Sequence, residues 1–408
     1  MLFLLALLAA LLAAGDASSD VHATIEQLIT EKGYPYELHN ITTADGFVLH
    51  AQRIPHGRNG AFAGTARPPV ILQHGLLDSA FTWVMNSAEE SLAFILADAG
   101  FDVFLTNSRG NLFSMENTHY SKHDLAFWAW SWDEMARYDV PANIDHVLQV
   151  TGYETLSYVG HSQGTTQGFA FWTTGNWSRS YADKVNQFVA LAPVAYIKHQ
   201  RAFLLRVLAD LHADLLFELL GDKSFLPSSK ILETLFPFAC KIVPGICSDI
   251  IGAICGFDKA DFNETRIPVY VGHYPSGTSV RDAAHYAQEV RSGEFAMYDF
   301  GSKHENEKHY GQETPPQYDL SAYNTQVPLL LVTGNHDDLA DTEDIARLKS
   351  ELPPGSFQEL NIPAYSHLSF VWGTDANTLI YPNITATLKA ASGMGRRAAS
   401  PSGRIEQK

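Results

Sequence analysis

Basic residues are scarce in this 408-residue sequence. Twenty-eight lysines and arginines stand against 45 aspartates and glutamates, which gives a net charge of −17. Proteins bind the phosphate backbone of nucleic acids mainly through such cations, so the composition argues against a nucleic-acid partner. Long apolar runs are also missing after the first residues, and no later stretch is uncharged for long enough to span a bilayer. We therefore expect no transmembrane segment in the body of the chain.

Cysteine is scarce as well, with three residues at positions 240, 247 and 255. A single disulfide would leave one of them unpaired. A bond between Cys240 and Cys247 would close a loop that contains Pro244-Gly245, which helps the chain to turn back. A zinc site is the alternative, but three cysteines without a nearby histidine fit such a site poorly.

The N-terminus is rich in leucine, alanine and phenylalanine up to about Gly15, and small residues precede a cleavage point after Ala17. We interpret residues 1–17 as a cleaved signal peptide. A membrane anchor is the alternative, but the apolar run is shorter than the roughly 20 residues that a spanning helix needs. A signal peptide places the mature chain in the secretory pathway, extracellular or lysosomal.

Four N-glycosylation sequons fit a secretory chain, and we expect most of them to be used on the surface. Their asparagines are Asn40, Asn176, Asn263 and Asn383.

The run Gly160-His161-Ser162-Gln163-Gly164 is the most specific motif of the sequence. It follows the strand-like segment Leu156 to Val159 and precedes a segment that can begin a helix. A serine on a sharp strand-to-helix turn needs small residues two positions to either side, because bulky ones would clash where the backbone folds back. This is the nucleophile elbow of the α/β-hydrolases, and it predicts that Ser162 is a nucleophile.

Short apolar runs alternate with helical stretches along much of the chain. This alternation predicts an α/β fold with a mostly parallel central sheet and helices on both faces. The strand-like runs begin at Val70, Val103, Leu156, Phe188 and Leu329, and the helical stretches include 88–97 and 135–150.

The alternation stops between about residues 193 and 320. Leucines from Leu204 to Leu219 recur at helical spacing there, and a very apolar segment, 232–257, follows. We interpret 193–320 as an inserted helical cap with a lid, between two parts of the hydrolase core at 18–192 and 321–389. The leucine stripe suits packing within the cap or binding at an interface equally well. The tail, 390–408, lacks apolar periodicity and is predicted to be disordered.

A serine hydroxyl needs a base to take its proton, and the base needs a carboxylate to orient it. In this fold the chain order is serine, acid, histidine. Two segments that follow strands supply that order, and we predict Asp337 as the acid and His367 as the base. Asp338 and Asp341 are rival acids, although Asp341 also suits the start of a helix. A calcium loop of EF-hand type is excluded because its spacing and glycine are missing.

The tetrahedral intermediate needs backbone N–H donors. The amide of Gln163, directly after the nucleophile, is one candidate. The second is the amide of Leu76, in the loop that follows the strand beginning at Val70. The run 304–309 contains two histidines and two glutamates, but it lacks the His-Glu-x-x-His zinc spacing and is interpreted as a solvated loop. We expect neither a metal nor an organic cofactor.

The sequence resembles the acid lipase family, which includes the gastric and lysosomal acid lipases, over nearly the whole mature chain. The resemblance rests on ordered blocks at 33–35, 45–46, 73–77, 107–111, 132–136, 138–142, 160–166, 275–279, 339–341 and 370–373. It implies a serine esterase that acts on triacylglycerols or sterol esters beneath a cap and a mobile lid.

Residue by residue, the resemblance implies Ser162, Asp337 and His367 as the triad and the amides of Leu76 and Gln163 as the oxyanion hole. It also implies that Cys240 and Cys247 form the cap disulfide of the family, in a shorter loop. Two positions depart from the family pattern. Asp338 stands where a bulky apolar residue is usual, and Ser369 stands where Asp is common. An extra carboxylate beside Asp337 could raise the pKa of the acid or displace it.

These observations together predict a secreted or lysosomal serine lipase that cleaves neutral lipid esters through an acyl-enzyme, works at a lipid–water interface and is a monomer. A catalytically weak lipid carrier with the same fold is the alternative. Epoxide hydrolases and dehalogenases of this fold have an acidic nucleophile, and Ser162 argues against them.

Overall fold

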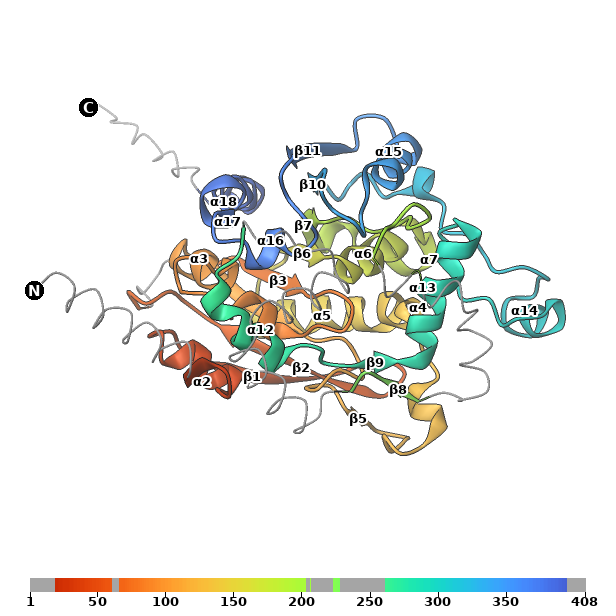
Figure 1. Ribbon diagram of the computed structural model, residues 1–408, viewed down its shortest axis with the longest axis horizontal. Coiled ribbons are helices and arrows are strands. Elements are labelled where there is room, and N and C mark those ends of the chain that lie inside the picture. Colours follow the sequence, from red (N-terminus) through yellow and green to blue (C-terminus); the bar gives the residue numbers. More distant parts are fainter. Residues whose placement is uncertain (1–18, 61–65, 203–205, 207–222, 228–260, 395–408) are drawn as a thin grey trace, which may run out of the picture.

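The computed structural model describes residues 19–60, 66–202, 206, 223–227 and 261–394 (Figure 1). The predicted signal peptide, the three cysteines with their predicted disulfide, and the leucine-rich part of the predicted cap lie outside these residues. Most of the predicted hydrolase core lies inside them.

A nine-stranded sheet forms the centre of the molecule, in the order β1-β2-β4-β3-β6-β7-β10-β11 with β5 beside β2. Neighbours from β4 to β11 are parallel, whereas β1, β2 and β5 form antiparallel pairs at one edge. A short antiparallel pair, β8 and β9, lies outside this sheet. The strands are β1 Glu37–Thr42, β2 Phe47–Ile54, β3 Pro69–Gln73, β4 Asp102–Thr106, β5 Glu116–Asn117, β6 Leu156–His161, β7 Val185–Leu191, β8 Ser224–Phe225, β9 Thr278–Ser279, β10 Leu329–Gly334 and β11 Phe357–Ile362.

Helices connect the parallel strands. The α-helices are α2 Ile25–Thr30, α3 Leu92–Asp98, α4 Trp132–Glu134, α5 Val140–Thr151, α6 Gln163–Thr173, α7 Gly175–Ser178, α12 Ile267–His273, α13 Val280–Ser292, α14 Lys303–Tyr310, α15 Thr342–Glu351, α16 Ser369–Trp372, α17 Ala376–Leu379 and α18 Tyr381–Ala391. Short 3-10 helices are η1 Ala80–Trp83, η2 Leu125–Trp128, η4 Ala182–Lys184, η6 Glu264–Arg266 and η7 Leu320–Ala322, and a π-helix, η3, spans Met135–Asp139.

The central strands are buried on both faces, because alternate side chains point into two separate apolar clusters. On β3, Ile71 packs in the cluster that contains Phe169 of α6, whereas Val70 and Leu72 pack in the cluster that contains Phe94 of α3. A parallel strand covered by helices on both sides must be apolar throughout, as these strands are. The predicted fold class is therefore confirmed, and the five apolar runs correspond to β3, β4, β6, β7 and β10.

Three local predictions need correction. The run 304–309, interpreted as a loop, lies in the helix α14, whose first turn is capped when the Ser302 hydroxyl accepts from Glu305 N. Figure 1 shows α14 projecting from the edge of the molecule. A helix in that position does not need an apolar face, so its sequence has no apolar period. The helix predicted over 135–150 begins as the π-helix η3. The helix α18 runs to Ala391, past the predicted core boundary at 389, because Leu388 in its last turn is buried.

No helix among the described residues is long and apolar enough to cross a membrane.

Candidate active site

Ser162 lies at the junction of β6 and α6, where the backbone is strained. Its φ is 52° and its ψ is −118°, a left-handed conformation that a residue with a side chain rarely adopts. Such strain persists only where the surrounding structure enforces it, and it is common at functional sites. Here the buried strand β6 and the wholly buried helix α6 hold the two sides of the turn. The predicted strand–serine–helix geometry is present.

The two glycines of the elbow are required by close backbone contacts. A Cβ on Gly160 would lie 2.6 Å from the carbonyl oxygen of Gly164. A Cβ on Gly164 would overlap the carbonyl oxygen of Gln73, at the start of the loop that carries Leu76. The missing side chain at Gly164 therefore lets the N-terminus of α6 approach that loop.

Replacing Gly164 by alanine is expected to destabilise the fold by about 3 kcal/mol, because the new methyl group meets fixed backbone and not a flexible side chain. Gly175→Ala is the matched control, since its Cβ would meet nothing nearer than Arg179 Nη2 at 4.0 Å. Urea unfolding of the two variants measures the difference. Equal stability of both would show that the elbow is looser than this geometry requires.

The structure brings Ser162, His367 and Asp337 together from three different loops. His367 Nε2 lies 2.7 Å from Ser162 Oγ. His367 Nδ1 lies 3.0 Å and 2.9 Å from the two carboxylate oxygens of Asp337. All three side chains are buried, with 8 %, 2 % and 3 % of Ser162, His367 and Asp337 exposed. The order nucleophile–base–carboxylate is the one that activates a serine hydroxyl.

The two rival acids lie elsewhere. Asp337 is oriented by its own loop, because its Oδ1 accepts hydrogen bonds from Leu339 N and Ala340 N at 2.8 Å each. Asp341 instead caps α15, where its Oδ1 accepts from Glu343 N and Asp344 N. Asp338 is partly exposed, and its carbonyl oxygen accepts from the backbone of Arg201. Of the three carboxylates, Asp337 alone contacts His367 among the described residues.

Leu76 and Gln163, the predicted oxyanion-hole residues, both lie close to Ser162. Leu76 lines a pocket together with Ser162 and His367. Gln163 is the first residue of α6, and the first N–H groups of a helix have no partner within the helix. Its amide is therefore available to an oxyanion.

The side chain of Gln163 is fixed by a buried carboxyl group. Gln163 Nε2 donates to Asp282 Oδ2 at 2.7 Å, and Thr278 Oγ1 donates to the same oxygen at 2.7 Å. Asp282 belongs to α13, so this contact links the region predicted as the cap to the oxyanion residue. Sequence reasoning missed Asp282, since nothing in its neighbourhood marks it.

Two buried histidines, His161 and His74, form hydrogen bonds with the backbone of segments next to the site. His161 Nε2 lies 2.9 Å from the carbonyl oxygen of His367, which makes this nitrogen the donor of the hydrogen bond. His74 Nε2 accepts from Ser108 N at 3.0 Å and thereby ties the loop of Leu76 to the loop that follows β4. Burial lowers the pKa of His161 to about 3 and that of His74 to about 4, so both remain neutral at moderately acid pH.

The pocket above Ser162 is mainly apolar. Its lining includes Leu77, Val194, Ile197 and Leu368. Such a surface suits an acyl chain better than a polar leaving group.

The comparisons with known proteins agree with this geometry. Residues 25–87 match the family model for a partial α/β-hydrolase lipase region, and residues 68–217 match the α/β-hydrolase fold. A gastric triacylglycerol lipase of Rattus norvegicus is 44% identical over 370 residues, which cover 90% of this chain and 92% of the relative. This chain belongs to the acid lipase family.

A second member is a Crotalus adamanteus protein whose name assigns it provisionally as a lysosomal acid lipase/cholesteryl ester hydrolase. It is 41% identical over 354 residues, 86% of this chain and 87% of the relative. Among solved structures, a soluble variant of monoglyceride lipase from Saccharomyces cerevisiae has a TM-score of 0.50 at 13% identity and covers 91% of this chain and 98% of its own. That likeness supports the fold.

Several sequence blocks that mark the acid lipase family are structural in this member. Arg109 is 1 % exposed and donates to both Asp45 and Asp139. At the departing position, the Ser369 hydroxyl donates to Asp261 Oδ2 at 3.1 Å. Asp261 therefore places a carboxylate beside Ser369, the position at which the family commonly has Asp.

Stability of this acid lipase is expected to rise as the pH falls from about 8.5 to 6.5. Burial raises the pKa of Asp78, Asp133 and Asp282 to about 7 each, well above the value near 4 of an unfolded chain. A carboxyl group whose pKa is higher in the folded than in the unfolded protein stabilises the fold. This contribution is complete below the pKa of the unfolded chain and is lost as the pH rises through 7. Three such groups amount to about 2 kcal/mol over this interval.

Below pH 6.5 the buried histidines oppose this gain. Burial lowers the pKa of His161 and His285 to about 3. These histidines therefore become protonated in the unfolded chain but not in the folded chain, which lowers the stability of the fold. Thermal melts at half-unit pH steps should therefore show a Tm that rises as the pH falls from 8.5 to 6.5, with the further gain below pH 6.5 reduced by the two histidines. Asp282→Asn should flatten the limb above pH 6.5. A Tm that falls steadily from pH 8.5 to 6.5 would contradict the burial of these acids.

Proposed function

We propose that this protein is a serine lipase of the secretory pathway that hydrolyses carboxylic ester bonds of neutral lipids through an acyl-enzyme. The observation that carries the proposal is the continuous hydrogen-bonded series Asp337–His367–Ser162 beneath an apolar pocket. Triacylglycerols and sterol esters are the substrate classes, supported by the printed names of the gastric and lysosomal relatives.

In the acylation step, Ser162 Oγ attacks the ester carbonyl carbon while His367 Nε2 takes the hydroxyl proton. Asp337 holds the other ring nitrogen and stabilises the imidazolium that forms. The amides of Leu76 and Gln163 would donate to the oxyanion. The tetrahedral intermediate then collapses as His367 gives its proton to the leaving alcohol.

Deacylation repeats these steps with water. His367 takes a proton from a water molecule, the hydroxide attacks the acyl carbon, and the proton returns to Ser162 as the fatty acid leaves. This chemistry needs the side chains and amides named above and no cofactor. The neutral His161 beside His367 favours the cycle, since a cation there would disfavour the imidazolium.

Secretion or delivery to the lysosome forms part of the same proposal. Asn40, Asn176 and Asn383 are exposed, whereas Asn263 is partly buried. The first three suit glycosylation. The signal peptide over 1–17 and the Cys240–Cys247 disulfide lie outside the described residues and remain predictions.

Fatty-acid release tests the function. The purified protein would be titrated in a pH-stat on emulsified trioleoylglycerol, a cholesteryl ester and a short-chain ester between pH 4 and 8. Release from at least one long-chain neutral lipid is expected, and the ratio between the two long-chain substrates assigns the preference. Folded protein that binds lipid and releases no fatty acid from any ester would overturn the enzyme and favour a lipid carrier.

A further inference from the structure

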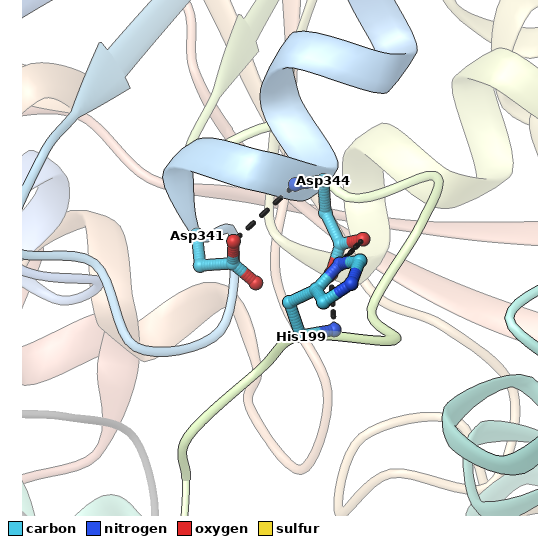
Figure 2. Close-up of side chains that lie close together, drawn as sticks. All are labelled: His199, Asp341 and Asp344. Atoms are coloured by element: carbon cyan, nitrogen blue, oxygen red, sulfur yellow. Dashed lines mark hydrogen bonds and ion pairs between the residues drawn. The ribbon is translucent and has the colours of Figure 1, made fainter.

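A second cluster of chemically reactive side chains lies where the segment that follows β7 meets the start of α15. It consists of His199, Asp341 and Asp344, each offering one ligand atom, and these atoms lie within 4.8 Å of one another (Figure 2). His199 comes from the segment that follows β7, whereas the two aspartates belong to the start of α15. The cluster joins two segments that are 142 or more positions apart in the sequence.

Three of the four carboxylate oxygens have conventional partners. Asp344 Oδ1 contacts His199 Nδ1 at 2.9 Å, and Asp344 Oδ2 accepts from His199 N at 2.8 Å. Asp341 Oδ1 accepts from Glu343 N at 2.7 Å as the cap of α15. These bonds orient both carboxylates.

The fourth oxygen, Asp341 Oδ2, is buried and has no hydrogen-bond partner among the described residues. Asp341 is 2 % exposed, and Figure 2 shows this oxygen on the side of the carboxylate nearer to His199. A buried carboxylate oxygen without a donor is costly, and a second carboxylate next to it adds to the cost. A positive ion between the two would remove both costs.

We propose that His199, Asp341 and Asp344 bind a divalent transition-metal ion of the Zn²⁺ type. The ligands are Asp341 Oδ2, Asp344 Oδ1 and His199 Nδ1, which together form an imidazole–dicarboxylate set that Zn²⁺ accepts. Ca²⁺ fits less well, because it takes six to eight oxygen ligands and avoids imidazole.

The geometry needs only a small adjustment. Zn²⁺ lies about 2.0–2.2 Å from such ligands, so tetrahedral ligand atoms are about 3.4 Å apart. Zn²⁺ binding would replace the hydrogen bond between Asp344 Oδ1 and His199 Nδ1 with release of the Nδ1 proton, and side-chain rotation would close the present spread of 4.8 Å. Glu343 Oε2 lies 3.7 Å from His199 Nε2 and suits the outer partner that orients a metal-bound imidazole. Asp341 also lines a hollow of about 320 Å³ together with Arg201 and Asp338.

The ion would act on structure and not on the reacting atoms. Asp341 directly follows Ala340, whose amide donates to the Asp337 carboxylate. An ion that fixes Asp341 to His199 therefore ties the loop of the proposed acid to the segment that enters the predicted cap. The site does not depend on the proposed lipase activity.

Metal binding by the intact protein tests the proposal. After treatment with a chelator and its removal, Zn²⁺ would be titrated calorimetrically at pH 7.5, where the imidazole is available as a ligand. One site of micromolar or tighter affinity is expected, together with a rise in Tm on addition of Zn²⁺. Co²⁺ in place of Zn²⁺ should give d–d bands without thiolate charge-transfer absorption, which excludes the cysteines as ligands.

Variants assign the site. His199→Ala should weaken binding by at least about tenfold, since even the outer partners of a metal contribute that much. His304→Ala is the matched control, because His304 is also exposed but lies on α14. Asp341→Asn keeps a capping oxygen and should also weaken binding. The proposal is overturned if Zn²⁺ does not bind, if thiolate bands appear, or if His199→Ala and His304→Ala bind Zn²⁺ equally.

Discussion

Ser162→Ala is expected to lower kcat for ester hydrolysis by about 10⁴- to 10⁶-fold, with binding of lipid retained. The reason is the 2.7 Å contact between His367 Nε2 and Ser162 Oγ, which makes this hydroxyl the one that the imidazole can deprotonate. The steady-state rate on an emulsified long-chain ester measures the effect. His367→Ala should cause a loss of similar size, and the double variant should lose little more, because the residues act as one unit.

Ser157→Ala is the matched control for this loss. Ser157 is also a buried serine of β6, five positions earlier, and its hydroxyl donates to Asn186. Its removal should cost stability of about 1 kcal/mol and leave kcat within a few-fold of wild type. Residual activity of Ser162→Ala above about one part in a hundred would mean that another group performs the attack.

Asp337→Asn is expected to lower kcat by about 10⁴-fold near neutral pH. The amide keeps the size of the side chain, but it can donate a proton to Nδ1 and so stabilise the tautomer whose Nε2 cannot accept from Ser162. It also removes the charge that stabilises the imidazolium. The variant should fold, since the amide oxygen can still accept from Leu339 N and Ala340 N.

Asp338→Asn and Asp341→Asn separate the three candidate acids. Asp338 has no contact with His367, so its variant should keep kcat within a few-fold of wild type. Asp341→Asn should mainly affect the start of α15 and the stability of the protein. A large loss of kcat in Asp338→Asn with little loss in Asp337→Asn would move the acid by one position and contradict the geometry described above.

Sequence periodicity predicted the centre of the fold because that part is uniform in burial. Strands such as β3 and β10 are buried on both faces and are therefore continuous apolar runs. The hairpin β1–β2 was missed for the opposite reason: β1 is mostly exposed and polar, with Ile41 its one buried residue. The π-helix η3 was missed because its five residues keep the apolar pattern of an ordinary helix.

The proposed site was predictable where function fixes the local sequence. Ser162 is marked by glycines that backbone contact requires, and Asp337 and His367 each follow a strand that ends at the same edge of the sheet. His161, His74 and Asp282 were not found, because each acts through a contact far away in the sequence. The separation between His161 and His367 is 206 positions, and that between Gln163 and Asp282 is 119 positions. A single sequence carries no signal for such pairs.

Covalent labelling tests the central claim most directly. The folded protein would be treated with a long-chain fluorophosphonate, digested, and analysed by mass spectrometry. The account predicts one adduct, on the Ser162 hydroxyl, formed in parallel with the loss of ester hydrolysis and absent from Ser162→Ala. An adduct on another residue that accounts for the inactivation, or full inactivation with Ser162 unmodified, would contradict it.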